Sequence, residues 1–343
     1  PRPIRCVTFA GRHGDAVVRE VAPLRPGLVL HDTFAVIGRV VAFHLGIPRV
    51  NARAGAAGGG GRPPPPPRGP VFVSPECEAA VRTLRQRHGI PDASPFSFRI
   101  DQGADLTVCS IPPEFGPPEF GPPEFGTPGA VDPAEPVAFF GSYWPARSIA
   151  RTPAEEPFGP GADSFLRVYV SFGTAVWHHF EREAMAALEV LAEALGRRPE
   201  VRALISLGGH DRPAAAARLA RPNVRVEPYV DQIHVLRTAS VYVTHHGLNS
   251  THEALYHGVP MISYPFAADQ PGTAARCREL GLAVPLGAAG GGPITVEDVE
   301  RALAAIVAGG DALRTRLAMA RAWETAVIDR RPEVIRRITA LIR

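Results

Sequence analysis

Strand-like apolar segments alternate with helical patterns through the second half of this chain. Residues 166–172 have the length and apolarity of a buried strand, and Gly173 follows them. Apolar residues then recur at helical spacing from 180 to 195, and further strands are predicted at 201–207, 223–226, 240–244 and 259–264. This alternation predicts a doubly wound parallel sheet, in which ligands bind beyond the carboxyl ends of the strands.

The first half follows the same pattern less completely. Strands are predicted at 4–9, 28–31 and 48–51, with a helix at 34–45. A chain of 343 residues is long for one core and sufficient for two. We therefore predict an α/β protein with two Rossmann-like doubly wound domains, the N-terminal one shortened. The predicted parts are a first domain at 1–145, a linker at 146–162, a second domain at 163–325 and a C-terminal helix at 326–343.

Composition excludes several classes of function. The net charge of +3, from 37 basic and 34 acidic residues, is too balanced to favour a nucleic-acid partner. All basic residues are arginine, so chemistry that needs a lysine amine is excluded, including Schiff bases, Walker-type phosphate loops and kinase-type ATP binding. The apolar runs are too short for a membrane span and the N-terminus does not resemble a signal peptide. Four scattered cysteines predict reduced thiols in a cytoplasmic protein, and the arginine-rich, lysine-free composition is typical of a bacterial genome of high GC content.

Proline and glycine are concentrated in three segments. Residues 55–70 contain a glycine run and five consecutive prolines, which predicts an exposed, polyproline-like loop. Residues 112–126 repeat Pro-Pro-Glu-Phe-Gly three times, which we interpret as a duplication inside a loop whose Phe115, Phe120 and Phe125 are candidates for a partner contact. The third segment, 145–161, has the composition of an interdomain linker.

The segment 244–260, Thr-His-His-Gly-Leu-Asn-Ser-Thr-His-Glu-Ala-Leu-Tyr-His-Gly-Val-Pro, carries the strongest signal for chemistry. It follows a predicted strand, turns at Gly247 and enters a helix at Asn249 or Ser250. One interpretation is structural, because Ser250 and Glu253 have the spacing of a capping box. The other is functional: free N–H groups at the helix start bind a phosphate, with His245 as a further donor and Glu253 as an acceptor for ribose hydroxyls.

This segment resembles the donor-binding signature of family-one glycosyltransferases, which have the GT-B fold. The signature is His-x-Gly-x-x-Ser-x-x-Glu followed by Gly-Val-Pro, a strand and Asp-Gln, and the resemblance extends over about 160–310. Residues 171–174 and 226–232 are similar to two other family segments, with Tyr229 where the family usually has Trp and Asp231 where it often has Pro. Bacterial macrolide, carotenoid and other natural-product enzymes of secondary metabolism, including antibiotic biosynthesis, are the most similar members.

The resemblance implies a donor site for a UDP- or dTDP-sugar. His245 and the N–H groups of Asn249 and Ser250 would hold the diphosphate, and Glu253 the ribose. Asp269 and Gln270 would bind sugar hydroxyls, with a cap of the next helix as the structural alternative. The complete predicted donor site is Ser171, Gly173, Thr174, Tyr229, Val230, Gln232, His245, Gly247, Asn249, Ser250, Glu253, Asp269 and Gln270.

Four histidines within 245–257 also raise the question of a metal. We expect no metal and no cofactor, because His245, His252 and His257 fall on a loop and on different helix faces, and no cysteine completes a ligand set. His246, His252 and His257 are then surface or packing residues. Similarly, His31 is expected at a strand end and His44 on a helix surface.

The first half supplies the catalytic candidates that the resemblance implies. Residues 27–50 resemble the region with the family's orienting aspartate, which corresponds to Asp32, and a helix N-cap is the structural alternative. The family's basic histidine follows the first strand. Either the chain is truncated before this region, or the strand at 4–9 is followed by the loop 11–14 and His13 is the base, although Gly-Arg-His-Gly departs from the family pattern. The family's last helix returns to the first domain, and Val334, Ile335, Ile338, Leu341 and Ile342 would form that docking face.

These observations predict an inverting glycosyltransferase that moves a sugar from a UDP- or dTDP-sugar to a hydroxyl of a small natural product. The expected partners are therefore the nucleotide sugar and a hydroxylated acceptor, with no nucleic acid and no membrane span, and a homodimer stays open. Two alternatives remain. One is a catalytically degenerate member that binds a nucleotide sugar or a partner protein, favoured by the short first half and the absent histidine motif. The other is a different GT-B enzyme, such as a sugar-nucleotide epimerase.

Overall fold

The computed structural model describes residues 4–54, 73–98, 103–116, 136–142, 156–287 and 292–342. The chain divides into two compact units by its internal contacts. Unit 1 comprises 1–141 together with 326–343, and unit 2 comprises 142–325. The glycine- and proline-rich loop at 55–70, most of the repeat at 112–126 and residues 146–155 of the predicted linker lie outside the described residues.

Unit 1 contains a parallel sheet whose strands lie in the order in which they occur in the sequence. The order is β1-β2-β3-β4, and all three pairs are parallel. Right-handed crossovers between strands in this order place the connecting helices on one face of the sheet. The strands are β1 (Val29–Asp32), β2 (Arg49–Arg53), β3 (Leu106–Cys109) and β4 (Val137–Phe139).

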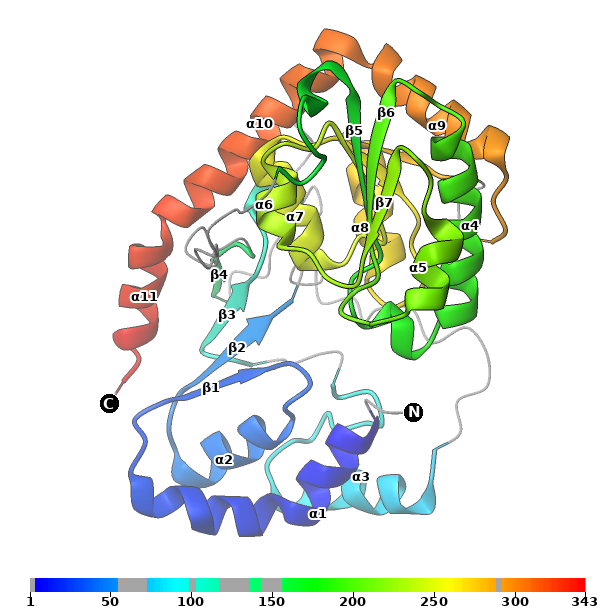
Figure 1. Cartoon of the computed structure of the whole chain (residues 1–343). Helices are drawn as coiled ribbons and strands as arrows, with labels where there is room; N and C mark the ends of the chain where they lie inside the picture. Colours follow the sequence, from blue (N-terminus) through cyan, green and yellow to red (C-terminus); the bar gives the residue numbers. More distant parts are fainter. Residues whose placement is uncertain are drawn as a thin grey trace. The chain divides into compact units, whose positions relative to one another are not determined.

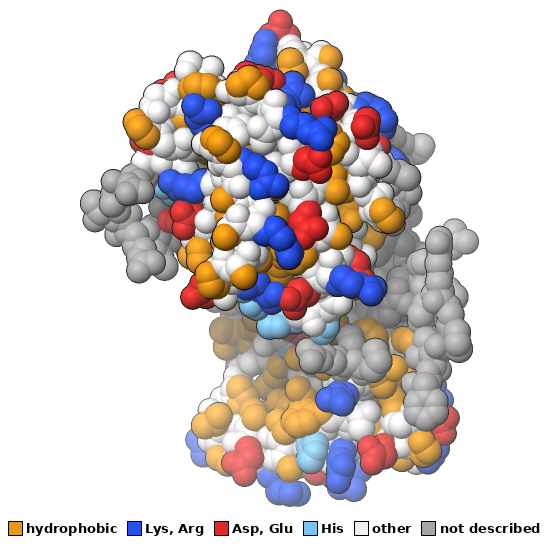
Figure 2. All heavy atoms as spheres, turned by 45° about the vertical axis from the view of Figure 1, so that its right-hand side comes forward, with side chains coloured by type: hydrophobic (Ala, Val, Ile, Leu, Met, Phe, Trp, Pro, Cys, Tyr) orange, Lys and Arg blue, Asp and Glu red, His pale blue; other side chains and the backbone are white. Residues whose placement is uncertain are grey.

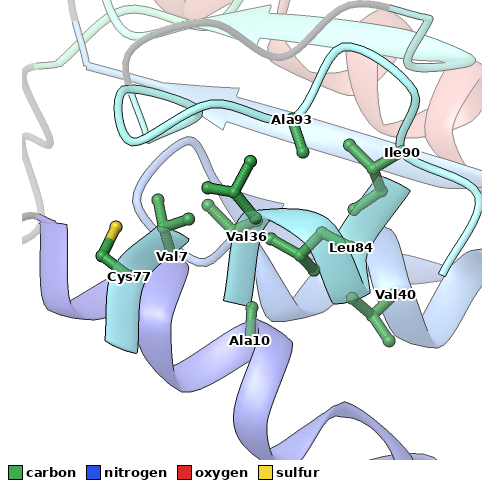
Figure 3. Packing of buried hydrophobic residues seen from close by; sticks show 9 residues of the cluster. Val7, Ala10, Val36, Val40, Cys77, Leu84, Ile90 and Ala93 are labelled. Atoms are coloured by element: carbon green, nitrogen blue, oxygen red, sulfur yellow. The ribbon is translucent and has the colours of Figure 1, made fainter. Parts of the chain in front are cut away.

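In unit 1, helix α1 (Ile4–Val21) packs against both α2 (Ile37–Leu45) and α3 (Pro75–Arg87). Their shared core includes Val7, Ala10, Val36, Val40, Cys77, Val81, Leu84, Ile90 and Ala93, most of which appear in Figure 3. The strand predicted at 4–9 is wrong, because these residues form the start of α1. Ile4 and Val7 in that segment and Ala10 just after it recur at helical spacing, and Val7 and Ala10 are fully buried.

The C-terminal helix α11 (Arg331–Thr339) packs on the sheet of unit 1 and lies apart from α1, α2 and α3 (Figure 1). Val334 packs with Val50, Leu106, Val108 and Ala138, and Ile338 and Leu341 lie against the same cluster. Arg331 Nε donates to the carbonyl of Phe140 at 2.7 Å. The predicted docking face was too wide, because Ile335 and Ile342 are about half exposed, at 49% and 54%.

Unit 2 contains a six-stranded parallel sheet in the order β10-β9-β8-β5-β6-β7. The chain starts in the middle at β5, runs outward to β7, and returns to β8 on the other side of β5. This is the doubly wound arrangement predicted from the sequence, with its switch point between β5 and β8. The strands are β5 (Leu166–Ser171), β6 (Val201–Ser206), β7 (Val224–Glu227), β8 (Val241–Thr244), β9 (Met261–Ser263) and β10 (Ala283–Pro285).

Helices cover both faces of the unit 2 sheet, with α4 and α5 on one side and α6 and α7 on the other (Figure 1). Figure 2 shows arginine and acidic side chains interspersed over the face that carries α4 and α5. The helices are α4 (Glu181–Gly196), α5 (Pro213–Leu219), α6 (Gln232–Leu236), α7 (Leu248–His257), α8 (Gln270–Glu279), α9 (Val296–Ala308) and α10 (Gly310–Asp329).

The sequence analysis missed the helix α3 and the strands β3 and β10. β3 and β10 are short, and α3 contains polar residues around most of its circumference, so their patterns are weak. The four cysteines are free, as predicted, and Cys77, Cys109 and Cys277 are buried. Phe115, the first phenylalanine of the repeat, is also buried, so it offers no exposed ring to a partner. Among the described residues, no helix is both long enough and apolar enough to cross a membrane.

Candidate functional site

The carboxyl ends of β5 and β8 lie side by side at the switch point of unit 2, because Ser171 pairs with Thr244. Each strand is followed by a loop that contains predicted donor-site residues. Ser171 Oγ accepts from the N–H of Gly173 at 3.3 Å, which forms a tight turn directly after β5, and Thr174 next to it is exposed. The predicted residues of both loops therefore meet at the edge where doubly wound sheets bind ligands.

The ring of His245 is enclosed by two glycines, one from each loop. A Cβ atom on Gly173 would lie 2.7 Å from His245 Cε1, and one on Gly247 would lie 2.5 Å from His245 Nε2. Gly173 also has a φ of +68°, which favours glycine. Neither position accepts a side chain without moving the imidazole.

His245 is buried and neutral. Burial lowers its pKa to about 4, and a hydrogen bond to the backbone of Ser171 opposes this shift. A neutral imidazole has one N–H and one acceptor nitrogen, so it can donate to a phosphate oxygen without bringing a full charge. The positive electrostatic contribution must then come from elsewhere.

The first turn of α7 supplies that contribution. Gly247 is the N-cap of α7, and no side chain caps the helix. Within the described part of the chain, the N–H groups of Leu248, Asn249 and Ser250 have no hydrogen-bond partner, and they lie at the positive end of the helix dipole. The capping box considered for Ser250 and Glu253 is therefore wrong, and the helix start has the properties of an anion site.

Ser250 and Glu253 instead bind a side chain from another helix. Gln232, the first residue of α6, donates through Nε2 to Glu253 Oε2 at 2.6 Å and to Ser250 Oγ at 3.1 Å. Its Oε1 accepts from Tyr242 at 3.0 Å and from Tyr169 at 3.3 Å. Gln232 therefore links the two central strands to α7.

The two tyrosines fix the direction of the Gln232 amide. Both are fully buried and their rings stack with centroids 4.8 Å apart. Burial raises the pKa of Tyr242 to about 12 and that of Tyr169 well above its usual value, so both hydroxyls remain donors. Because they occupy the oxygen end of the amide, its nitrogen must face Glu253. The sequence analysis missed both tyrosines, although a tyrosine inside an aliphatic strand is a signal for such a buried hydrogen bond.

The loop before α6 presents an exposed aromatic ring. Tyr229 is 66% exposed and Val230 beside it is half-buried. Asp231 is the N-cap of α6, and its carboxylate accepts from the N–H groups of Ile233 at 3.1 Å and of His234 at 3.2 Å. Asp231 thus fixes the turn that holds Tyr229 at the surface, where its ring can stack on a planar ligand.

Asp269 and Gln270 lie at the start of α8, after the carboxyl end of β9. Asp269 is the N-cap residue but makes no side-chain cap, and it is exposed. Gln270 Oε1 accepts from the N–H groups of Phe266 and Ala267, at 2.8 and 3.2 Å. Asp269 and Gln270 thus occupy the N-cap and first turn of α8, as the structural alternative predicted, although the Asp269 carboxylate makes no capping bond. The amide nitrogen of Gln270 is directed away from the loop that its oxygen closes.

The side chain of Asn249 already has a hydrogen-bond partner. Its Oδ1 accepts from the hydroxyl of Ser142 at 2.5 Å. The backbone N–H of Asn249 is the group that remains available at the helix start.

Residues 164–314 match the family model of the UDP-glucoronosyl and UDP-glucosyl transferases. This range contains the donor-site residues just described, including the two tyrosines. Over this range the chain is similar to that family.

Curated relatives match different lengths of the chain. An uncharacterized UDP-glucosyltransferase of Bacillus subtilis is 26% identical over 257 residues, which cover 74% of this chain and 59% of that protein. The oleandomycin glycosyltransferase of Streptomyces antibioticus is 35% identical over 118 residues, 34% of this chain and 26% of that one. The chain therefore spans less than two thirds of the length of these relatives.

Solved glycosyltransferases share the fold over nearly the whole chain. The calicheamicin glycosyltransferase CalG4 has a TM-score of 0.71 at 21% identity and covers 99% of this chain and 83% of its own. The glycosyltransferase of kitacinnamycin has a TM-score of 0.68 at 21% identity, covering 96% and 80%. The fold is GT-B, as the sequence predicted.

The predicted catalytic aspartate of this glycosyltransferase fold lies at the carboxyl end of β1. Asp32 is exposed, and its Oδ1 accepts from the N–H of Ala35 at 2.8 Å. It caps the turn that leads into α2, whose own N-cap is Val36. One carboxylate oxygen therefore stabilises the turn, and the other is available to orient a base.

His13 is not in a loop after a strand, which corrects the reason for selecting it. It is exposed on the middle of α1 and contacts the ring of Phe9, with centroids 4.9 Å apart. Asp32 influences the pKa of Cys6, one of the first residues of α1, and His13 lies seven residues further on, about 10 Å along the helix axis. No hydrogen bond joins His13 and Asp32, both of which the structure describes. His13 as the base stays an untested prediction.

The other histidines near the donor site are part of the core. His246 is buried with a φ of +60°, and its ring lies between Thr251 Oγ1 at 3.2 Å and Ser263 Oγ at 2.7 Å. His252 is buried on α7, and its Nδ1 is 2.5 Å from Glu324 Oε1 on α10. These two histidines are thus packing residues and not surface residues.

Proposed function

We propose that this protein is an inverting glycosyltransferase that uses a UDP- or dTDP-sugar and a small hydroxylated natural product. The observation that carries the proposal is the uncapped start of α7 at the switch point, next to the neutral His245 and the Gln232–Glu253 pair. These groups match a nucleoside diphosphate: N–H groups for the phosphates, a carboxylate for the ribose and the Tyr229 ring for the base. The names of the relatives, UDP-glucosyltransferase and oleandomycin glycosyltransferase, support the substrate classes.

In the proposed reaction an acceptor oxygen forms a bond to the anomeric carbon while the bond from that carbon to the diphosphate oxygen breaks. The acceptor proton passes to a base, which Asp32 orients. The leaving diphosphate gains negative charge at the positive end of α7, so this helix start stabilises the transition state more than the ground state. We propose that this contribution, and no metal or other cofactor, stabilises the leaving group. Asp269 and Gln270 would hold the sugar hydroxyls.

Aromatic side chains beside Asp32 support a flat, apolar acceptor. Phe34 is 50% exposed and stacks on Phe98, with ring centroids 6.0 Å apart and planes within 13° of parallel. Phe96 extends the group, 6.4 Å from Phe98. The exposed ring of Phe34, stacked on the half-buried Phe98 next to a candidate catalytic carboxylate, forms a surface that fits a polyketide or polyphenol ring.

The first test of the donor site is a thermal-shift series with UDP, dTDP, GDP and UMP. A ligand at a hundred times its dissociation constant stabilises the folded chain by about 2.7 kcal/mol. UDP or dTDP should raise the melting temperature, and UMP should do so less because it lacks the second phosphate. The increase should be lost in Glu253→Gln and reduced in His245→Ala. If these nucleotides raised the melting temperature of both variants as much as that of the wild type, the proposed donor site would be contradicted.

A second candidate function is nucleotide-sugar binding without catalysis. The absence of a hydrogen bond between His13 and Asp32 favours it. Release of UDP from a UDP-sugar only when a hydroxylated aromatic acceptor is present would establish transfer. Tight nucleotide binding without such release would favour the binding protein, and release without acceptor would indicate another GT-B activity.

A further inference from the structure

Three side chains of the kinds that bind metal ions meet in unit 1, at the junction of its three packed helices. Asp15 is on α1, His44 is in the last turn of α2, and His88 is the C-cap of α3. One ligand atom from each lies within 4.8 Å of the others. None of the three belongs to the proposed donor or acceptor site.

The two imidazoles point one nitrogen each at a common position. His44 Nε2 and His88 Nδ1 are 2.8 Å apart, the length of a hydrogen bond with a single shared proton. A divalent ion between the same two nitrogens needs Zn–N bonds of about 2.0–2.1 Å, so a separation of about 3.3 Å at tetrahedral angles. The nitrogens therefore need to move apart by only about 0.5 Å, which the exposed His44 side chain can supply.

Electrostatics at this junction favour a cation. His44 and His88 lie at the C-terminal ends of α2 and α3, which carry the negative ends of the helix dipoles. Asp15 adds a carboxylate whose Oδ2 forms an ion pair with Arg87 at 2.7 Å. In the described part of the chain its Oδ1 has no partner and remains available for a metal.

His88 is held in place by packing. Its side chain is fully buried, its Nε2 has no hydrogen-bond partner among the described residues, and a Cβ on Gly14 would lie 2.8 Å from that nitrogen. Burial and the neighbouring His44 lower the pKa of His88, although Asp15 opposes this. The ring is thus pre-oriented with Nδ1 toward His44.

We propose that Asp15, His44 and His88 bind one divalent transition-metal ion of the zinc class, with water at the remaining position. Two imidazoles and one carboxylate suit zinc, cobalt or nickel better than magnesium or calcium, which prefer oxygen ligands. The ion would join α1 to the ends of α2 and α3 and thereby stabilise unit 1. It would have no part in the proposed sugar transfer.

The test uses the full chain, prepared without a polyhistidine tag and stripped with a chelator. Titration with ZnCl₂ should show one bound ion per chain and a higher melting temperature, and MgCl₂ should have no effect. CoCl₂ should give the visible absorption bands of a low-coordinate nitrogen–oxygen site. Failure of the wild-type chain to take up zinc would overturn the proposal.

Three variants separate the metal site from adventitious binding. His44→Ala removes an exposed ligand with little effect on the core, and it should weaken zinc binding at least about 10-fold. Arg87→Gln removes the group that competes for Asp15, so it should tighten binding several-fold, which a simple histidine–histidine hydrogen bond does not explain. His179→Ala, at an exposed histidine of unit 2, is the control and should bind as the wild type does. Zinc binding that is unchanged in both His44→Ala and Arg87→Gln would also overturn the proposal.

Discussion

The carboxyl edges of the two sheets differ in how far their polar side chains are already held in position. In unit 2, Gln232 makes hydrogen bonds to four side chains, and His245 is enclosed by Gly173 and Gly247. In unit 1, Asp32 is exposed, and within the described residues its carboxylate accepts only from the N–H of Ala35 in its own turn. Ordering a side chain on binding costs free energy, so the edge of unit 2 is prepared for a ligand and the edge of unit 1 is not.

Under the proposed function, this difference assigns donor binding to unit 2 and activation of the acceptor to unit 1. The preorganised edge of unit 2 suits a ligand that is the same in every reaction, such as a nucleoside diphosphate. The exposed carboxylate of unit 1, beside stacked rings, suits acceptors of varied shape. Variants that disturb only one edge should therefore affect either nucleotide binding or transfer. The following predictions test this separation in order of expected size.

The largest effect is expected on transfer from Asp32→Asn. The asparagine oxygen can still accept from the N–H of Ala35, so stability should change by less than about 0.5 kcal/mol. Loss of the charge that orients the base should lower the rate of transfer by about 10²- to 10⁴-fold. UDP-sugar turnover and UDP affinity should be measured together, with Glu20→Gln as an exposed control in unit 1. A loss of UDP affinity that parallels the loss of turnover would contradict the separation.

The same difference explains why the residues at the edge of unit 2 were easier to predict from the sequence than those of unit 1. The donor residues lie on one long ordered motif and two shorter segments, each of which follows a strand, so their places after β5, β7, β8 and β9 could be assigned from strand ends alone. Tyr169 and Tyr242 could not, because a bond to Gln232 depends on which strands are neighbours in the sheet. In unit 1 the segment 4–9 was assigned as a strand because six residues cannot distinguish the two periods. The error moved His13 from a helix to a loop.

The second prediction compares two glycines of unit 2 with nearly the same backbone. Gly173 has a φ of +68° and Gly161 a φ of +71°, but only a side chain at Gly173 would collide with His245. Alanine at either position should cost about 1–2 kcal/mol of stability from backbone strain. Only Gly173→Ala should also weaken UDP binding, by about 10-fold or more, equivalent to 1.4 kcal/mol. Calorimetric titration with UDP decides between these outcomes, and an equal loss of affinity in both variants would show that His245 is not the cause.

The third prediction separates the two ends of the Gln232 amide. Gln232→Leu leaves the buried hydroxyls of Tyr169 and Tyr242 without this acceptor, so stability should fall by about 1–3 kcal/mol. Gln232→Glu keeps the acceptor but brings a second carboxylate to Glu253, 2.6 Å from the present amide nitrogen. For the same loss of stability, Gln232→Glu should therefore weaken nucleotide binding more than Gln232→Leu does. Urea unfolding measures the loss of stability, and UDP titration measures the loss of affinity. An equal ratio of these two losses in both variants would argue against a fixed orientation of the Gln232 amide.

The last prediction is a pH dependence that should be stronger in unit 2 than in unit 1. Burial lowers the pKa of His245 to about 4, that of His246 to about 3 and that of His257 to about 4, whereas an unfolded histidine titrates near 6.5. Above pH 6.5 both states are neutral and their contribution to stability is complete. As the pH falls from about 6.5 toward 4, the unfolded chain binds protons first, so the free energy of unfolding falls by up to about 1.4 kcal/mol per pH unit for each histidine.

Tryptophan fluorescence can follow this loss in unit 2, because the described tryptophans, Trp177 and Trp323, both lie there. In acid titrations the fluorescence change should precede the last loss of far-UV ellipticity, which also reports the helices of unit 1. His257→Gln, at a half-buried position on α7, should reduce the slope by one histidine's contribution. His210→Gln, at a half-buried histidine whose ring contacts Trp177 and His178, is the matched control. A slope that is equal in the two variants would mean that the buried imidazoles of the donor edge do not set the acid sensitivity of unit 2, and the contrast between the two edges would then concern ligand binding alone.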